Sequence, residues 1–297
     1  ATDMQIRPSF ASYKSDERAS LILHVNRFEK PGAKWEPLHL FLTIRKEKTT
    51  VKTESIDISD FASPYYLSIP VAQPLTPGLY TIEAKLSTGN PELTDKYADY
   101  ASTGFWCCDS ALIKMTQPLS AGSDYFARES KPIPLLGTTY MASDVHRKFL
   151  FEPNPAAWDR DFTEMKANGI NIVRTGIWTG FRRIMMDPGA PSEEVLRAFE
   201  AFMLTAAQHE MPVIFTFFTF TPELWEGVNP YLDPRCLQAQ KEYIAAFARR
   251  FAGFNNLMWD LINEPSFLSH GRIWTCRPNH DEFEERAWKE WLAKRYE

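Results

Sequence analysis

Long hydrophobic runs are the first feature that the sequence lacks. No stretch of its 297 residues approaches the ~18 uninterrupted apolar residues that a membrane-spanning helix needs. An excess of positive charge is also missing, since 33 Lys and Arg face 38 Asp and Glu and the formal net charge is -5. This balance provides no electrostatic footprint for nucleic acid or for an anionic membrane surface, and we expect neither partner.

Cysteine and the short motifs of several enzyme classes are scarce as well. The four cysteines, Cys107, Cys108, Cys236 and Cys276, have no metal-ligand spacing, and a vicinal pair forms a poor bridge with itself. The sequence has no Gly-x-Gly-x-x-Gly fingerprint, no Gly-x-x-x-x-Gly-Lys phosphate loop, no Gly-x-Ser-x-Gly elbow and no His-x-x-x-His pair. We therefore expect no nucleotide cofactor and no metal, and a serine hydrolase or metallohydrolase is disfavoured.

Aromatic residues, in contrast, are abundant. Phe, Tyr and Trp make up 14% of the chain, with 21 Phe, 11 Tyr and 9 Trp. Such a surplus is typical of clefts that stack flat, weakly polar ligands, and equally of a core that is simply rich in rings. The length of 297 residues allows one large domain or two of ordinary size.

The first part of the chain has the alternation of β-strands. Apolar residues recur at every second position in three runs, at 38–44, 65–71 and 80–86, and Pro-Gly or Gly-Asn-Pro turns separate the runs. This pattern predicts an antiparallel β-sandwich over residues 1–125, followed by a linker at 126–132. We expect the sandwich to be an accessory or structural domain, and a carbohydrate-contacting face is a less favoured option.

From residue 133 onward, apolar strands alternate with amphipathic helices. Capping residues begin the predicted helices at Asn154-Pro155, Ser192, Asp233-Pro234 and Asp281. Continuous apolar runs predict strands that are buried on both faces, and these lie at 134–141, 170–177, 212–218 and 257–262. The alternation predicts a parallel sheet, either doubly wound or closed into a (β/α)8 barrel.

We favour the barrel, because a doubly wound nucleotide binder would carry a phosphate-binding fingerprint. The predicted fold is therefore multi-domain: a β-sandwich followed by an α/β TIM-type barrel over residues 133–297, of which only the first four βα units are present.

Chemistry in such barrels lies at the carboxyl ends of the strands. Glu264 directly follows the fourth run, within Asn263-Glu264-Pro265, where partial burial would suit a general acid. Asn263 can hydrogen-bond a sugar hydroxyl. Arg174 lies among Ile and Val in the second run, so we expect it either to anchor a catalytic carboxylate or to form a structural ion pair. Asp260 is expected to make structural hydrogen bonds.

Aromatic side chains follow the same strand ends. Tyr140 ends the first run, Trp178 follows the second, and Phe220 and Trp225 follow the third. Because rings suit the apolar faces of sugars, Tyr140, Trp178 and Trp225 join Asn263 and Arg174 as predicted substrate-binding residues. Packing explains any one of these rings at least as well.

Three segments together resemble the first half of the clan A glycoside hydrolases: Gly137-Thr-Thr-Tyr140, Met165-Lys-Ala-Asn-Gly-Ile-Asn-Ile-Val-Arg174 and Trp259-Asp-Leu-Ile-Asn-Glu264-Pro. These are retaining (β/α)8 enzymes that include the cellulase/mannanase family and certain β-galactosidase families. The resemblance covers residues 133–297 and implies hydrolysis of β-glycosidic bonds without a cofactor. It implies that Glu264 is the acid/base, that Asn263 contacts the sugar and that Arg174 supports the nucleophile.

Two departures from the clan pattern leave questions open. Cellulase-type families place a His near the end of the third strand, whereas this chain has Phe217-Phe-Thr-Phe-Thr, so the sugar stays undetermined. The clan nucleophile is a Glu after the seventh strand, and we expect it in sequence beyond residue 297. The chain alone is therefore expected to be catalytically incomplete, since retaining hydrolysis needs two carboxyl groups.

Partners and location follow from the same interpretation. Besides an oligosaccharide or polysaccharide substrate, we expect self-association or a second barrel half, because half a barrel leaves two unpaired strand edges and an apolar face. Enzymes of this kind with a sandwich in front are often exported, so we expect a secreted or periplasmic protein whose signal peptide is not present in this sequence. The alternative is a non-catalytic carbohydrate-binding or cell-surface recognition protein.

Overall fold

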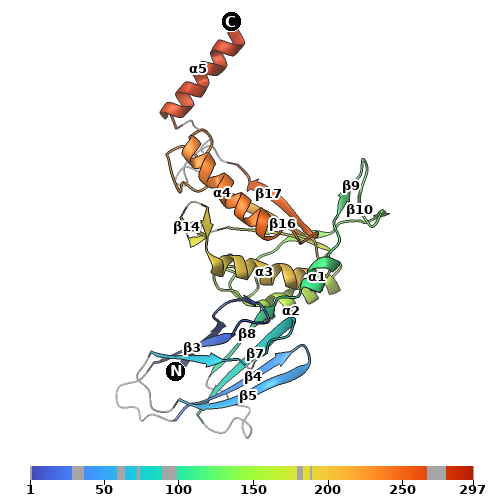
Figure 1. The fold of residues 1–297 in the computed structure, drawn as a ribbon, viewed down its shortest axis with the longest axis vertical. Helices are drawn as coiled ribbons and strands as arrows, with labels where there is room; N and C mark the ends of the chain where they lie inside the picture. The colour runs from blue at the N-terminus through green and yellow to red at the C-terminus, as the bar shows by residue number, and fades with distance from the viewer. Residues whose placement is uncertain are drawn as a thin grey trace. The chain divides into compact units, whose positions relative to one another are not determined.

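A computed structural model describes the fold for residues 2–28, 37–58, 64–71, 74–88, 99–178, 183–187, 189–265 and 279–296 (Figure 1). The chain divides into two compact units, each built from three stretches of sequence. The first unit comprises Ala1–Met115, Ala142–Asn168 and Arg197–His209, and the second comprises Thr116–Met141, Gly169–Leu196 and Glu210–Glu297. Within the described ranges, no helix has both the length and the apolar character needed to cross a membrane.

Two β-sheets form the N-terminal part of the first unit. One has the order β1-β3-β6, with β1 (Thr2–Pro8), β3 (Ser20–Arg27) and β6 (Tyr65–Pro70). The other has the order β2-β8-β7-β4-β5, with β2 (Ser12–Tyr13), β8 (Asp99–Cys107), β7 (Gly78–Ser87), β4 (His39–Lys46) and β5 (Thr49–Asp57). Neighbouring strands are antiparallel except for the short β2–β8 pair.

The inward residues of both sheets form one hydrophobic core, as in a β-sandwich. Leu42 of β4, Ile82 of β7 and Leu23 of β3 all belong to this core and are fully buried. The predicted period-two pattern over 38–44 and 80–86 is therefore confirmed, because every second side chain points into the core.

Two helices pack onto the sandwich within the first unit: α2 (Pro155–Ala167) and the part of α3 (Glu193–Gln208) that begins at Arg197. The buried indole N–H of Trp106 in β8 donates to the hydroxyl of Thr205 in α3 at 2.9 Å. Arg197 makes two hydrogen bonds to Glu17, at 2.7 and 2.8 Å, and its guanidinium lies 4.4 Å from the centre of the Phe10 ring. The sandwich and these helices are thus held by polar as well as apolar contacts.

Local sequence signals explain why α2 forms where it does. The side chain of Asn154 accepts a hydrogen bond from the backbone N–H of Ala157, and Pro155 occupies the first turn. Asn168 caps the other end, and Gly169 follows with a φ of +82°, which a glycine adopts without steric cost. Both predicted boundaries of this helix are confirmed.

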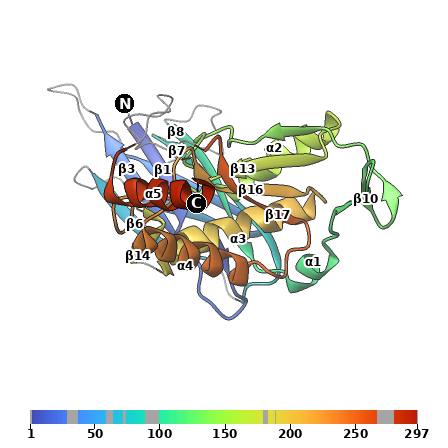
Figure 2. The same cartoon turned by 90° about the horizontal axis from the view of Figure 1, so that it is seen from above.

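A four-stranded parallel sheet is the centre of the second unit. Its order is β12-β13-β16-β17, with β12 (Gly137–Thr139), β13 (Ile172–Gly176), β16 (Val213–Thr219) and β17 (Leu257–Asn263). Helix α4 (Pro234–Arg250) packs on β16, where Phe247 stacks on Phe215 at 6.0 Å and Tyr243 meets the Phe217 ring edge-on at 5.4 Å. Figures 1 and 2 show β16 and β17 running side by side. The predicted parallel sheet is confirmed.

Several short elements were not expected from the sequence. They are α1 (Ser110–Met115), the small sheet of β9 (Ser120–Ala121), β10 (Phe126–Arg128) and β11 (Lys131–Pro132), and the hairpin of β14 (Met185–Asp187) and β15 (Ala190–Pro191). Strands β10 and β11 occupy most of the predicted linker at 126–132. Helix α5 (Glu282–Tyr296) begins after Asp281, as predicted.

The expectation that all four parallel strands are buried on both faces is wrong for the two outer strands. All three residues of β12 are exposed, and in β17 the side chains of Leu261 and Trp259 are 60% and 36% exposed. The reason is the strand order, because β12 and β17 each have only one neighbour within the described sheet. The inner strands β13 and β16 are buried almost throughout.

Gly104 tests the packing of α2 against β8. A Cβ at this position would lie 2.8 Å from the carbonyl oxygen of Tyr80 and 3.0 Å from the backbone nitrogen of Ala156. We expect Gly104→Ala to lower the free energy of unfolding by about 1–3 kcal/mol through overpacking, measured by denaturant titration. Gly122→Ala is the matched control, because its Cβ would meet only the Tyr125 carbonyl oxygen, at 3.3 Å. Equal stability of the two variants would contradict this packing.

Candidate active site

Polar side chains from three neighbouring strands meet in the parallel sheet of the second unit. Arg174 comes from β13, Thr216 from β16, and Asp260 and Asn263 from β17. Thr216 and Asp260 are direct partners in the strand register, which brings their side chains together. Because parallel strands end at the same edge, Asn263 lies at the carboxyl edge of this cluster.

Asp260 is the carboxylate partner of Arg174. Its Oδ2 accepts hydrogen bonds from Arg174 Nη2 at 2.5 Å, from Arg174 Nε at 3.2 Å and from Thr216 Oγ1 at 2.8 Å. The Arg174 and Asp260 side chains are 31% and 29% exposed, so solvent screens the pair only in part. A guanidinium among Ile and Val needs such a partner. The sequence left two roles open for Arg174, an anchor for a catalytic carboxylate or a structural ion pair. The structure shows the ion pair, with Asp260.

Arg174 also fixes the amide of Asn263. Its Nη1 donates to Asn263 Oδ1 at 2.8 Å, and this bond makes Oδ1 the acceptor that faces the guanidinium. The Nδ2 group of Asn263 is therefore the end of the amide that remains for another acceptor. Within the described ranges, three of the five N–H groups of Arg174 are used in these contacts, and two donors remain for a further carboxylate.

Glu264 follows at the tip of β17, where the strand ends. Its backbone has a φ of +47°, an uncommon conformation for a residue with a side chain, and Pro265 comes next. The side chain is exposed, so the partial burial expected for it is not found among the described residues. The structure thus places Glu264 beside Asn263 at the strand end, as an exposed residue.

The three predicted aromatic residues occupy different environments. Tyr140 is only 4% exposed, and its backbone joins β12 to β13, since its N–H donates to Arg174 O at 2.7 Å. Trp178 is half-buried, and its ring centre lies 5.7 Å from the guanidinium carbon of Arg174. The Trp225 ring packs against Tyr243 and Phe218, at 5.2 and 6.1 Å. Only Trp178 therefore lies directly beside the polar cluster.

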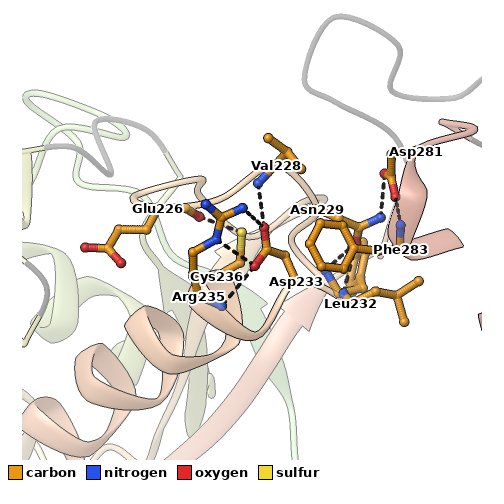
Figure 3. A network of polar contacts seen from close by, with 10 residues as sticks. Glu226, Val228, Asn229, Leu232, Asp233, Arg235, Cys236, Asp281 and Phe283 are labelled. Atoms are coloured by element: carbon orange, nitrogen blue, oxygen red, sulfur yellow. Dashed lines mark hydrogen bonds and ion pairs between the residues drawn. The ribbon is translucent and has the colours of Figure 1, made fainter. Parts of the chain in front are cut away.

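The loop between β16 and α4 is held by two buried polar side chains, shown in Figure 3. Asp233 caps α4 through the N–H of Arg235 and also accepts from the N–H of Val228 at 3.1 Å. Its Oδ2 binds Arg235 Nη2 at 2.7 Å. The hydrogen bonds from Arg235 lower the pKa of Asp233 to about 2, and further bonds from backbone N–H groups act in the same direction. Asn229, the second residue, reaches Asp281 before α5.

Sequence reasoning did not single out Thr216 or Asn229, and it did not pair Asp260 with Arg174. The signal for the pair is the presence of two charged residues in otherwise apolar strands, but the partners are 86 residues apart in the chain. In the described ranges, no three His, Cys, Asp or Glu side chains form a group that could hold a metal ion. Cys107, Cys108 and Cys236 form no disulfide among the described residues, and Cys276 lies outside them.

Comparison with known families connects this cluster to an enzyme class. Residues 137–294, more than half of the chain, match the family described as Cellulase (glycosyl hydrolase family 5). The chain belongs to this cellulase family. The match contains every residue of the polar cluster, together with Tyr140, Trp178, Trp225 and Glu264. The predicted resemblance to the cellulase/mannanase enzymes of clan A is therefore confirmed.

Solved structures of glycosidases align with parts of this family 5 chain. A mutant of Bacteroides uniformis β-glucuronidase 2 aligns with 98% of the chain and 30% of its own, at 18% identity and a TM-score of 0.36. A family 5 protein from Bifidobacterium longum, solved with Manβ1-4GlcNAc, covers 53% of the chain and 39% of its own, at 15% identity and a TM-score of 0.44.

An exo-β-1,4-mannosidase from Opitutaceae bacterium strain TAV5 covers 48% of the chain and 28% of its own, at 15% identity and a TM-score of 0.43. The family 5 chain thus spans between 28% and 39% of the length of these three structures. A comparison with curated proteins finds no match.

The Arg174–Asp260 pair can be tested by a double-mutant cycle. We expect a coupling free energy of about 1–3 kcal/mol between Arg174→Ala and Asp260→Ala, because the pair is partly buried and two hydrogen bonds join the side chains. The control is the cross-strand pair Arg45–Glu83, at 2.9 Å with 38% and 37% exposed side chains. For that pair we expect about 0–1 kcal/mol. Equal couplings from denaturant titrations would contradict the assigned role of the Arg174–Asp260 pair.

Asp233 gives a pH-dependent prediction. Its pKa is lowered from 3.8 to about 2 in the folded protein, so its ionised form stabilises the fold above about pH 4, and this stabilisation is lost as the pH falls toward about 2. We expect Asp233→Asn to destabilise the protein at neutral pH and to differ less from wild type at about pH 3. Denaturant titration at both pH values measures the difference. Asp124→Asn, at an exposed position, is the control, and a gap independent of pH would refute the prediction.

Proposed function

We propose that this chain carries the acid/base half of a glycoside hydrolase that cleaves β-glycosidic bonds with retention. The observation that carries the proposal is the hydrogen bond from Arg174 to Asn263 Oδ1, which fixes the amide next to Glu264 at the carboxyl end of β17. This is the strand edge where parallel α/β barrels carry out their chemistry. The match to glycosyl hydrolase family 5 over residues 137–294 supports the reaction class.

The proposed reaction assigns a role to each residue of the site. The protonated Glu264 carboxyl group gives its proton to the leaving glycosidic oxygen while the nucleophile bonds to the anomeric carbon. Glu264, now a carboxylate, then takes a proton from the water that releases the sugar, so its protonation state is restored. Asn263 donates from Nδ2 to a sugar hydroxyl. The nucleophile is a carboxylate supplied by sequence beyond residue 297, and it binds the two N–H groups that Arg174 has left.

The structural support for sugar binding differs among the three aromatic residues. Trp178 has the best support, because it is half-buried and lies beside the guanidinium of Arg174. Tyr140 and Trp225 take part more indirectly, since burial and ring packing hold both side chains. A β-linked oligosaccharide or polysaccharide is the proposed substrate, acted on outside the cytoplasm by a barrel that a second half or a second copy completes.

One observation favours a different function. Glu264 is an exposed residue, whereas a general acid benefits from a partly desolvated site. A non-catalytic carbohydrate-binding or recognition protein would tolerate this exposure. Calorimetry separates the two functions: oligosaccharide binding that is unaffected by Glu264→Gln, together with no turnover in a longer chain, would favour recognition.

The decisive experiment compares this chain with the natural protein continued beyond residue 297, on a panel of aryl β-glycosides. We expect turnover only in the longer protein, and a fall in kcat of about 10²–10⁴-fold in Glu264→Gln, which cannot donate a proton. Glu285→Gln, at an exposed position on α5, is the matched control. The anomeric configuration of the first product, followed by NMR, tests retention.

Two results would overturn the proposal in different ways. Turnover by the 297-residue chain that disappears in Glu264→Gln would show that the nucleophile lies within it. An active longer protein that is insensitive to Glu264→Gln would remove Glu264 from the acid/base role.

A further inference from the structure

Asn229 joins the loop after β16 to the residue that precedes α5. It lies in the loop between β16 and α4 and is 2% exposed. Its Oδ1 accepts hydrogen bonds from the backbone N–H groups of Tyr231 and Leu232, at 3.0 and 2.9 Å, and its Nδ2 donates to Asp281 Oδ2 at 2.8 Å. The two ends of one buried amide therefore fix the loop and bind the residue that precedes α5 (Figure 3).

Asp281 divides its two carboxylate oxygens between separate tasks. Oδ1 accepts the N–H groups of Phe283 and Glu284, at 2.9 and 3.0 Å, and so caps the first turn of α5. Oδ2 accepts the amide of Asn229. Capping α5 requires only one oxygen, so the contact with Asn229 is additional to the cap. It ties the residue before α5 to the loop that follows β16.

A short path of hydrogen bonds leads from this contact to the candidate active site. The hydroxyl of Tyr231 donates to the carbonyl oxygen of Phe220 at 3.4 Å, and the N–H of Phe220 donates to the carbonyl oxygen of Asn263 at 2.8 Å. Burial raises the pKa of Tyr231 to about 12, so its hydroxyl keeps the proton that it donates. The path ends on the backbone of the residue that precedes Glu264.

The backbone at the end of this path is held in an unfavourable conformation. Phe220 and Glu264 have φ values of +55° and +47°, and neither is a glycine. Such conformations cost about 1–3 kcal/mol each and persist only where the surroundings enforce them. The N–H of Phe220 binds the carbonyl oxygen of Asn263, which belongs to the peptide group that precedes Glu264. Whatever holds the loop at Phe220 therefore also bears on the direction in which Glu264 leaves β17.

We propose that Asn229 and Asp281 are positioning residues that hold the Asn263–Glu264 end of β17 by fixing the loop between β16 and α4. They touch neither the substrate nor the reacting atoms in this proposal, and they act through Tyr231 and Phe220. The effect on catalysis rests on the proposed function, whereas the effect on the backbone does not depend on it.

Swapping the side chains of residues 229 and 281 tests the proposal. Asn229→Asp places two carboxylates in contact, and Asp281→Asn sets two amide NH2 groups against each other, because Oδ1 of residue 281 is needed for the cap. The double variant restores one amide N–H donor and one carboxylate acceptor with the direction reversed. We expect each single variant to speed amide hydrogen exchange at Phe220 about tenfold, and the double variant to restore the wild-type rate within about threefold.

A second pair of variants separates the contact from the helix cap. Asp281→Ser keeps a good N-cap for α5 but is too short to reach Asn229, whereas Asp281→Ala loses both functions. We expect faster exchange at Phe220 in both variants, and faster exchange at Phe283 only in Asp281→Ala. If Asn229→Asp or Asp281→Asn fails to fold, Asp281→Ser and the double variant still test whether the contact between residues 229 and 281 protects the amide of Phe220.

The results also separate this proposal from the proposed function. Exchange at Phe220 that stays at the wild-type rate in all variants, while Tyr231 and Leu232 lose protection, would confine Asn229 to its own loop and overturn the proposal. In an active longer protein we expect the single variants to lower kcat more than they raise KM, with recovery in the double variant. Faster hydrogen exchange at Phe220 in the variants of a protein without glycosidase activity would support the role of Asn229 and Asp281 in holding the backbone. It would at the same time contradict the proposed hydrolase function.

Discussion

The positive charge of Arg174 inside an apolar strand is the constraint on which the second unit depends. A guanidinium cannot be removed from water without compensation, and the neighbouring strands supply it through Asp260, Thr216 and Asn263. The compensation requires the strand order β13-β16-β17 and one particular register, because a shift by one residue would turn Asp260 to the opposite face. The ion pair therefore specifies the alignment of the sheet as well as the position of Asn263.

Local signals predicted much of the fold. Asn154, Asp233 and Asp281 begin helices by satisfying backbone N–H groups within three residues, and such contacts can be recognised in the sequence. Period-two burial in β4 and β7 is likewise a local pattern. The exposure of β17 was not predictable in this way, since an apolar run does not reveal how many neighbours a strand has. The strand order, a property of the whole sheet, decides it.

In the candidate site, too, local sequence signals indicated some residues, while long-range contacts could not be predicted. Asn263 and Glu264 were found from their place after an apolar strand, and Arg174 from its misfit among Ile and Val. The identity of its partner was not accessible, because Asp260 lies 86 residues further on and several other carboxylates were available. Trp225 shows a related difficulty: a ring after a strand end can equally complete a core, and here it packs on Tyr243. Position along the chain indicates candidates, and long-range packing assigns their contacts.

The division of the chain into two interleaved units has a consequence for folding during synthesis. Trp106 finds its hydrogen-bond partner Thr205 only after 99 further residues have been made. At typical elongation rates of 5–20 residues per second, the sandwich waits about 5 to 20 s for α3, with the side of β8 that α3 will cover still open. Contacts between residues so distant in sequence also slow folding, because the loop must close before they contribute. The first unit is therefore most exposed to aggregation or chaperone binding in the interval before α3 has been translated.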